Sequence, residues 1–205
     1  MGKLVFLAAV EEELESLKSS FSSSKLLAQE ECAFIALGVG TIDPLIALAK
    51  NQEVLTGEQI IFLGTAGILG KDFVPGETYQ AWFFRWTSIG LALKKGFLPP
   101  SLYPDIEARK FLGGPPTIMV ISSPEITADD GIARILEAEN SFCLENLEAY
   151  GVASWFKNHH KSISAILSVT NQVGKESHSQ YLKYRKLAWL KLADTVYRVI
   201  MNNKP

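Results

Sequence analysis

The chain has few cysteines, little net charge and no long apolar run, and each of these absences argues against a class of protein. Its 205 residues include two cysteines, Cys32 and Cys143, which lie so far apart that we expect buried, reduced thiols and neither a disulfide nor a metal site. Twenty basic side chains nearly balance 22 acidic ones, which disfavours nucleic acid or an anionic membrane as a partner and favours a small polar substrate. No apolar run approaches the roughly 18 residues that span a bilayer.

Length and composition predict one domain that covers residues 1–205. Apolar side chains make up 47% of the chain, which is enough to bury a core, and the length is at the upper end for a single domain. Residues 4–9 form a short apolar run followed at once by acidic residues, without the long apolar core and cleavage site of an export signal. We therefore expect a cytoplasmic protein.

Short apolar runs alternate with segments of helical periodicity, which is typical of α/β proteins. The expected strands are residues 3–9, 32–37, 59–63, 78–86, 117–122 and 162–169, and the expected helices are residues 11–21, 44–50, 128–139, 147–157 and 178–201. The third strand is expected to stop at Gly64. Residues 78–86 are aromatic and β-branched, which predicts an antiparallel or edge strand. The prolines and glycines of residues 96–116 predict an irregular excursion over the surface.

Three acidic residues, Glu11, Glu12 and Glu13, directly follow the first expected strand. Acidic side chains are favourable at the positive N-terminal end of a helix, so the cluster taken alone predicts a solvated helix start. A residue at the carboxyl end of a central strand, however, points into the crevice where open α/β sheets bind ligands. A functional role therefore requires one of the three to turn inward.

Two glycine motifs also follow expected strands. Residues 38–40, Gly-Val-Gly, predict a structural turn more than a phosphate-binding loop, because a strand-to-helix turn needs glycine backbone angles whether or not a ligand approaches. Residues 64–67, Gly-Thr-Ala-Gly, would let backbone N–H groups face a small ligand closely.

Two later motifs place a carboxylate and an amide near one cleft. Residues 145–149, Glu-Asn-Leu-Glu-Ala, open an expected helix, and residues 168–174, Ser-Val-Thr-Asn-Gln-Val-Gly, end an expected strand. A partly buried Glu148 needs donors, which two ribose hydroxyls, an ion pair or a helix cap would supply equally well. Asn171 is either a turn residue or a partner for a purine edge. His178 begins the last expected helix, where capping is favoured over catalysis.

In this order, residues 9–14 (Ala-Val-Glu-Glu-Glu-Leu) and the four motifs above resemble the nucleoside phosphorylase and nucleosidase superfamily. The chain is most similar to its hydrolytic branch, which includes methylthioadenosine/S-adenosylhomocysteine nucleosidase and futalosine hydrolase, and the last two motifs favour the latter. The resemblance implies a three-layer α/β/α fold with a central mixed, partly barrel-like sheet. It also implies cleavage of the N-glycosidic bond of a purine nucleoside.

The resemblance implies roles for nine residues. Glu13 would activate the attacking water, Glu148 would hold the ribose hydroxyls, and Asn171 would bind the base. Leu147 stands at the family's usual methionine, beneath the sugar. The further substrate contacts implied are Ala9, Thr65, Gly67, Ile126 and Asn146.

Two departures from family patterns bear on the reaction. Adenine-specific nucleosidases generally carry Asp where Asn171 stands, and an amide cannot protonate the leaving base. It can hydrogen-bond N7 and a 6-oxo group, which favours hypoxanthine or guanine and hence a futalosine-like or inosine-like substrate. Phe62 stands two residues before Gly64, where a phosphorylase of the hexameric class would carry Arg, so we expect water and not phosphate as the nucleophile.

Two alternatives stay open: a purine nucleoside phosphorylase, and a degenerate relative that binds a nucleoside without turnover. We expect no metal or organic cofactor, no nucleic-acid partner and no membrane association. The resemblance also implies a homodimer, with residues 79–86 and 97–111 as the expected contributors to its interface.

Overall fold

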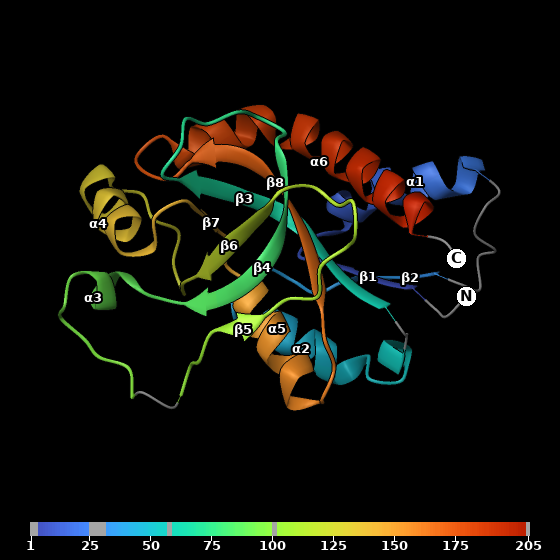
Figure 1. The fold of residues 1–205 in the computed structure, drawn as a ribbon, viewed down its shortest axis with the longest axis horizontal. Coiled ribbons are helices and arrows are strands. Elements are labelled where there is room, and N and C mark those ends of the chain that lie inside the picture. The colour runs from blue at the N-terminus through green and yellow to red at the C-terminus, as the bar shows by residue number, and fades with distance from the viewer. Residues whose placement is uncertain (1–3, 25–31, 57–58, 100–101, 204–205) are drawn as a thin grey trace.

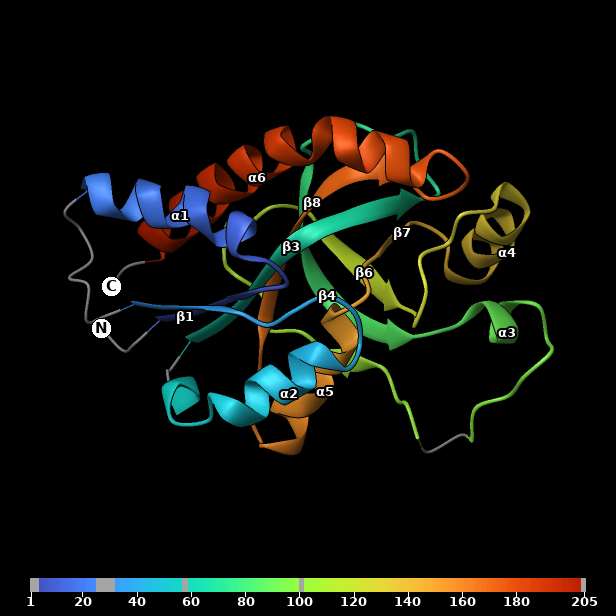
Figure 2. The same cartoon turned by 180° about the vertical axis from the view of Figure 1, so that it is seen from behind.

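The structure, a computed structural model, describes residues 4–24, 32–56, 59–99 and 102–203, which form a mixed sheet with helices on both faces (Figures 1 and 2). The strands are β1 (Leu4–Ala8), β2 (Cys32–Ala36), β3 (Gln59–Leu69), β4 (Thr78–Trp86), β5 (Ile106–Glu107), β6 (Thr117–Ser122), β7 (Cys143–Glu145) and β8 (Ser164–Gln172). The helices are α1 (Glu11–Ser24), α2 (Asp43–Lys50), the 3-10 helix η2 (Val54–Thr56), α3 (Ile89–Ala92), α4 (Asp130–Asn140), α5 (Ala149–Asn158) and α6 (Ser177–Asn202).

Part of the sheet closes on itself. The hydrogen-bonded order is β2-β1-β3-β7-β6-β4-β5, and β8 pairs with both β3 and β4. Strands β3, β7, β6, β4 and β8 therefore form a closed barrel, from which β1 and β2 continue as parallel strands. Helices α1 and α6 lie on one side of the sheet and α2 and α5 on the other (Figure 1). The predicted three-layer α/β/α fold with a mixed, partly barrel-like sheet is confirmed.

The two helical layers bury opposite faces of β1. Leu4 and Phe6 pack with the core beneath α1 and α6, whereas Val5 and Leu7 belong to the core beneath α2 and α5. Because successive side chains of a strand point to opposite faces, a central strand between two helical layers is apolar throughout. This explains why residues 4–8 form an unbroken apolar run in the sequence.

The third strand is longer than predicted. β3 does not stop at Gly64 but continues to Leu69, pairing with β8 on one side and β7 on the other. Gly64 lies within the strand, where it pairs with Leu167 of β8, and a Cβ at this position would lie 3.2 Å from the Leu167 side chain. The segment 64–67 is therefore a strand that carries its side chains to the site, and not a loop after a strand.

The segment around residues 143–149 also differs from the prediction. Residues 143–145 form β7, a strand too short to show periodicity in the sequence, and α5 consequently begins at Ala149 instead of residue 147. Strand β4 pairs antiparallel with β5 and β8, as expected, but it also pairs parallel with β6 and does not lie at the edge. Strand β8 extends to Gln172, so Asn171 lies in a strand and not in a turn.

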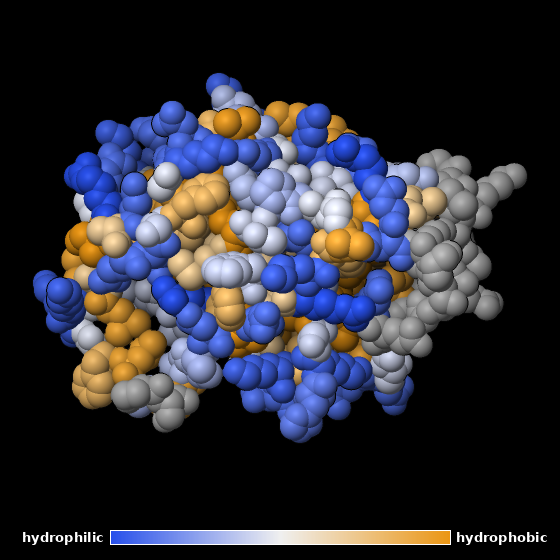
Figure 3. Space-filling view, in the orientation of Figure 1, coloured by the Kyte–Doolittle hydropathy of each residue, from blue (hydrophilic) through white to orange (hydrophobic). Residues whose placement is uncertain are grey.

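The described residues of the segment 96–116, which are 96–99 and 102–116, are mostly irregular, as predicted, apart from β5. The Tyr150 hydroxyl donates to the Pro104 carbonyl oxygen (3.0 Å) and so ties this excursion to α5. The side chains of Phe97 and Leu102 are 86% and 57% exposed. Figure 3 shows apolar side chains gathered at this end of the molecule, over α3 and the segment that follows it. Within the described ranges, no helix is long and apolar enough to cross a membrane.

The two cysteines lie in different strands. Cys143, in β7, is a fully buried thiol, whereas Cys32, in β2, is half-buried. Burial raises the pKa of Cys143 to about 12, which keeps this thiol protonated and unreactive at neutral pH. The expectation of a buried thiol is therefore correct for Cys143 and only partly so for Cys32.

Candidate active site

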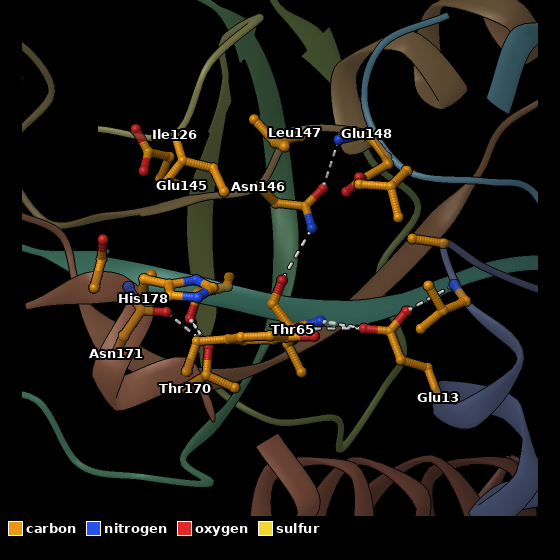
Figure 4. Close-up of a pocket in the computed structure, with 17 residues that line it drawn as sticks. Glu13, Thr65, Ile126, Glu145, Asn146, Leu147, Glu148, Thr170, Asn171 and His178 are labelled. Atoms are coloured by element: carbon orange, nitrogen blue, oxygen red, sulfur yellow. Dashed lines mark hydrogen bonds between the residues drawn. The ribbon is translucent and has the colours of Figure 1, made fainter. Parts of the chain in front are cut away.

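One cavity of about 300 Å³ lies towards the carboxyl ends of the parallel strands β1, β3 and β8. In α/β proteins, ligands bind in the crevice outside the carboxyl ends of the parallel strands. The structure brings all nine sequence-predicted residues to it: Ala9, Glu13, Thr65, Gly67, Ile126, Asn146, Leu147, Glu148 and Asn171. Figure 4 shows Glu13 and Glu148 on one side of the cavity and Asn171 and His178 on the other.

Glu13 is the one residue of the acidic cluster that turns inward. Its side chain is 4% exposed, whereas Glu11 and Glu12 are exposed. Its Oε1 accepts hydrogen bonds from the backbone N–H and the hydroxyl of Thr65 (3.0 and 3.2 Å), and Oε2 accepts one from the Val10 N–H (3.4 Å). The sequence pattern around residue 13 therefore begins a helix and also supplies a buried carboxylate.

Burial raises the pKa of Glu13 from its ordinary value of 4.5 to about 7, and the negative charge of Glu148 adds to the rise. The hydrogen bonds from Val10 and Thr65 favour the ionised form and oppose it. A carboxylate with this pKa exchanges its proton near neutral pH, which suits a general base.

Glu148, directly before α5, is a second buried carboxylate at 5% exposure. Its Oε1 accepts a hydrogen bond from the Gly40 N–H (2.8 Å), and burial raises its pKa while that bond lowers it. Gly40 has φ of 91°, a left-handed conformation that favours glycine. The turn at residues 38–40 thus binds a carboxylate of the protein itself. No described residue forms an ion pair with Glu148, which removes one of the alternatives left by the sequence.

Asn146 supplies the helix cap that Glu148 does not. Its Oδ1 accepts hydrogen bonds from the backbone N–H groups of Glu148 and Ala149 (3.1 and 2.8 Å), at the start of α5. Its Nδ2 donates to the carbonyl oxygen of Thr65 in β3 (3.0 Å). The oxygen and the nitrogen of the Asn146 amide therefore both form hydrogen bonds within the protein. They fix the position of Glu148 relative to Thr65, the residue that donates two hydrogen bonds to Glu13.

Asn171 lies at the end of the cavity away from Glu13. Its Oδ1 accepts a hydrogen bond from the Thr170 hydroxyl (2.8 Å), and its Nδ2 donates to the Gln172 carbonyl oxygen (3.1 Å). An amide has two N–H donors and two acceptor lone pairs, so one of each is left for a ligand. A Cβ at Gly67 would lie 2.8 Å from Asn171 Nδ2, which explains why the neighbouring position of β3 is glycine.

The cavity also has lining residues that sequence reasoning missed or left without a role. They are Val10, Val39, Ala66, Glu145, Thr170, Ser177, His178 and Tyr181. Most of them neighbour a predicted residue in sequence, but the last three reach the cavity because the N-terminus of α6 folds over it. No Lys or Arg lines the cavity among the described residues, and no cluster of three or more His, Cys, Asp or Glu side chains able to hold a metal occurs among them.

The comparisons with known proteins agree with this architecture. No family model and no curated protein matches the sequence. Solved structures do match: a mutant of Helicobacter pylori futalosine hydrolase superposes with a TM-score of 0.84 at 13% identity, covering 98% of this chain and 100% of that one. The chain has the nucleosidase fold.

Two further nucleosidases superpose over nearly their whole length. A mutant of the Helicobacter pylori methylthioadenosine/S-adenosylhomocysteine nucleosidase, with 5′-methylthioadenosine in its active site, gives a TM-score of 0.83 at 14% identity. The Neisseria meningitidis enzyme, in complex with methylthio-immucillin-A, gives 0.79 at 16% identity. Each comparison covers 98% of this chain and 99% of the other. The shared fold therefore extends over the segments that build the cavity.

Proposed function

We propose that the protein hydrolyses the N-glycosidic bond of a purine nucleoside whose base carries a 6-oxo group, as in futalosine or inosine. One observation carries the hydrolysis: a cavity in a nucleosidase fold holds the buried carboxylates of Glu13 and Glu148, without cationic partners among the described residues, opposite the Asn171 amide, which has a spare N–H donor. The 6-oxo preference rests on the same amide, because it cannot protonate an adenine leaving group. Buried carboxylates without an opposite charge beside them are costly, so their unused acceptor sites are expected to meet a ligand.

Glu13 is proposed to activate the water. Its ionised form accepts a proton from a water molecule that attacks the ribosyl carbon, and its pKa of about 7 allows that transfer at neutral pH. The bonds from Thr65 hold Oε1 in place, whereas Oε2 has only a long contact of 3.4 Å with the Val10 N–H. Oε2 is therefore the oxygen more available to the water.

Glu148 is proposed to bind the ribose. Gly40 uses one acceptor site on Oε1, which leaves the remaining lone pairs of the carboxylate for the two vicinal hydroxyls of a ribose. Its negative charge also stabilises the positive charge that develops on the sugar as the bond breaks. Leu147, the adjacent half-buried side chain, supplies an apolar surface for the sugar.

Asn171 is proposed to bind the leaving base. Its one spare N–H can donate to N7, so the structure supports a single strong bond to the base edge and not the two that the sequence alone predicts. An amide cannot deliver a proton, and hypoxanthine leaves as an anion more readily than adenine. Water is favoured over phosphate as the nucleophile because no Lys or Arg among the described residues lines the cavity.

The test is chromatographic detection of free base after incubation with futalosine, aminodeoxyfutalosine, inosine, guanosine and methylthioadenosine, each with and without phosphate. Phosphate-independent release of hypoxanthine is expected, lost in Glu13→Gln and retained in Glu12→Gln, its exposed neighbour. Release only with phosphate would identify a phosphorylase. Ligand-induced thermal stabilisation without release from any substrate would identify the degenerate binding protein.

We further propose that the protein is a homodimer. Val39, which lines the cavity, is 56% exposed, and Ile42 and Ile46 beside it are 70% and 48% exposed. Large exposed apolar patches mark interaction surfaces. Because Val39 belongs both to this apolar patch and to the cavity lining, we place the dimer interface at the rim of the cavity, and not at residues 79–86 and 97–111 as expected from the sequence. Sedimentation of the wild type and of Ile42→Asp tests this: a wild-type monomer would refute it.

A further inference from the structure

A third buried carboxylate, Glu145, lines the same cavity and has no part in the mechanism proposed above. It is the last residue of β7, and its side chain is 6% exposed. Figure 4 shows it beside Ile126, on the side of the cavity away from Glu13. It therefore faces the part of the cavity assigned to the base, and not the part assigned to the sugar.

Glu145 is the acceptor in both of its hydrogen bonds. Oε1 accepts from the Thr127 hydroxyl (2.6 Å), and Oε2 accepts from the Thr127 backbone N–H (3.3 Å). Among the described residues, no cation forms an ion pair with it. A carboxylate has about four acceptor sites, so about half of its capacity is unused. A buried acceptor with unused capacity is best satisfied by a ligand that donates.

The position of this carboxylate is fixed on both sides. The backbone of Glu145 is opposite Gly67 in β3 and Ile121 in β6, within the closed barrel. Thr127, which is fully buried, holds the side chain from the loop that also carries Ile126 to the cavity. A polar group held in this way discriminates between ligands because it cannot move to suit the wrong one.

We propose that Glu145 selects 6-oxopurines by accepting a hydrogen bond from the base. Hypoxanthine and guanine carry N1–H, a donor that matches the carboxylate, and guanine adds a 2-amino donor. Adenine presents a lone pair at N1, which would face the carboxylate lone pairs and leave both unsatisfied. This inference rests on the proposed function, because it takes the bound ligand to be a purine.

The experiment measures binding of the free bases, so that it does not depend on turnover. Calorimetric dissociation constants are determined for hypoxanthine, guanine and adenine with the wild type, Glu145→Gln and the control Glu139→Gln, an exposed residue of α4. The wild type is expected to prefer hypoxanthine over adenine by about 10-fold or more. Glu145→Gln is expected to lose most of that preference, since its amide can donate to adenine N1, and Glu139→Gln to keep it.

A second binding experiment changes the ligand and uses only the wild-type protein. 1-Methylhypoxanthine retains the 6-oxo group but lacks N1–H, and it is expected to bind the wild type at least 10-fold more weakly than hypoxanthine. Equal binding of the two bases, or an unchanged preference in folded Glu145→Gln, overturns the inference while leaving the hydrolase proposal intact. If no nucleoside is hydrolysed but the preference is present and depends on Glu145, the hydrolase proposal fails and this one stands.

Discussion

Replacing Glu13 with Gln is expected to slow hydrolysis by about 10²- to 10⁴-fold and, separately, to change how stability depends on pH. The side chain is 4% exposed and its pKa is raised from 4.5 to about 7, mainly by burial. At pH values between these two pKa values, the Glu13 side chain is more protonated in the folded protein than in the unfolded chain. Raising the pH through this window therefore favours unfolding, because the carboxylate ionises more easily in the unfolded state.

The magnitude follows from the difference between the two pKa values. Each tenfold change in proton affinity corresponds to about 1.4 kcal/mol, so the buried carboxylate costs up to about 3 kcal/mol of stability once the pH is above 7. Because part of this loss has already occurred at pH 5, the free energy of unfolding of the wild type should fall by about 2 to 3 kcal/mol relative to Glu13→Gln between pH 5 and pH 8.

Urea unfolding at a series of pH values measures this difference, and any constant effect of the substitution cancels because only the change with pH is compared. Glu12→Gln, at an exposed position of the same helix turn, should run parallel to the wild type. Parallel curves for the wild type and Glu13→Gln would refute a raised pKa. In the enzymatic assay, kcat/KM should rise with pH through about 7 in the wild type, and Glu13→Gln should lose about 10²- to 10⁴-fold in rate.

Three further substitutions test the positions around it. Glu148→Gln is expected to raise KM for the nucleoside and, because it removes a like charge, to shift the acid limb of the pH–rate profile to lower pH. Asn146→Ala is expected to lower the free energy of unfolding by about 1 to 2 kcal/mol through loss of the α5 cap, measured in urea. Gly67→Ala is expected to displace the Asn171 amide and weaken base binding more than it reduces stability, which titration with hypoxanthine checks.

Local patterns in the sequence predicted the α/β class, whereas the three layers and the nine residues that line the cavity were predicted from the resemblance to the nucleosidase superfamily. Residues 4–8 are apolar throughout since both faces of β1 are buried, and an unbroken apolar run is visible without a structure. The parallel strands β1, β3 and β8 bring residues 9, 13, 65, 67 and 171 to one side of the sheet, where the cavity lies. Residues 146–148 reach the same cavity from β7, which runs antiparallel to β3 and pairs Glu145 with Gly67.

The parts that the sequence did not predict depend on contacts between distant segments. Gly64 and Gly67 locally indicate the end of a strand, yet β3 passes through both because it pairs with β8 on one side and β7 on the other. At these two positions a Cβ would crowd the Leu167 and Asn171 side chains of β8. Strand β7 has only three residues and is defined by its partners, β3 and β6. Likewise His178 lines the cavity through the placement of α6, which no local pattern encodes.

The same contacts explain how the site keeps two carboxylates buried side by side. Asn146 and Thr65 connect them: the Asn146 amide holds the start of α5, where Glu148 lies, and donates to the backbone of the residue that holds Glu13. Like charges in a shared cavity repel, and this repulsion contributes to the raised pKa of Glu13. The network that fixes Glu148 near Glu13 therefore also raises the proton affinity of Glu13, the proposed general base, although burial contributes more.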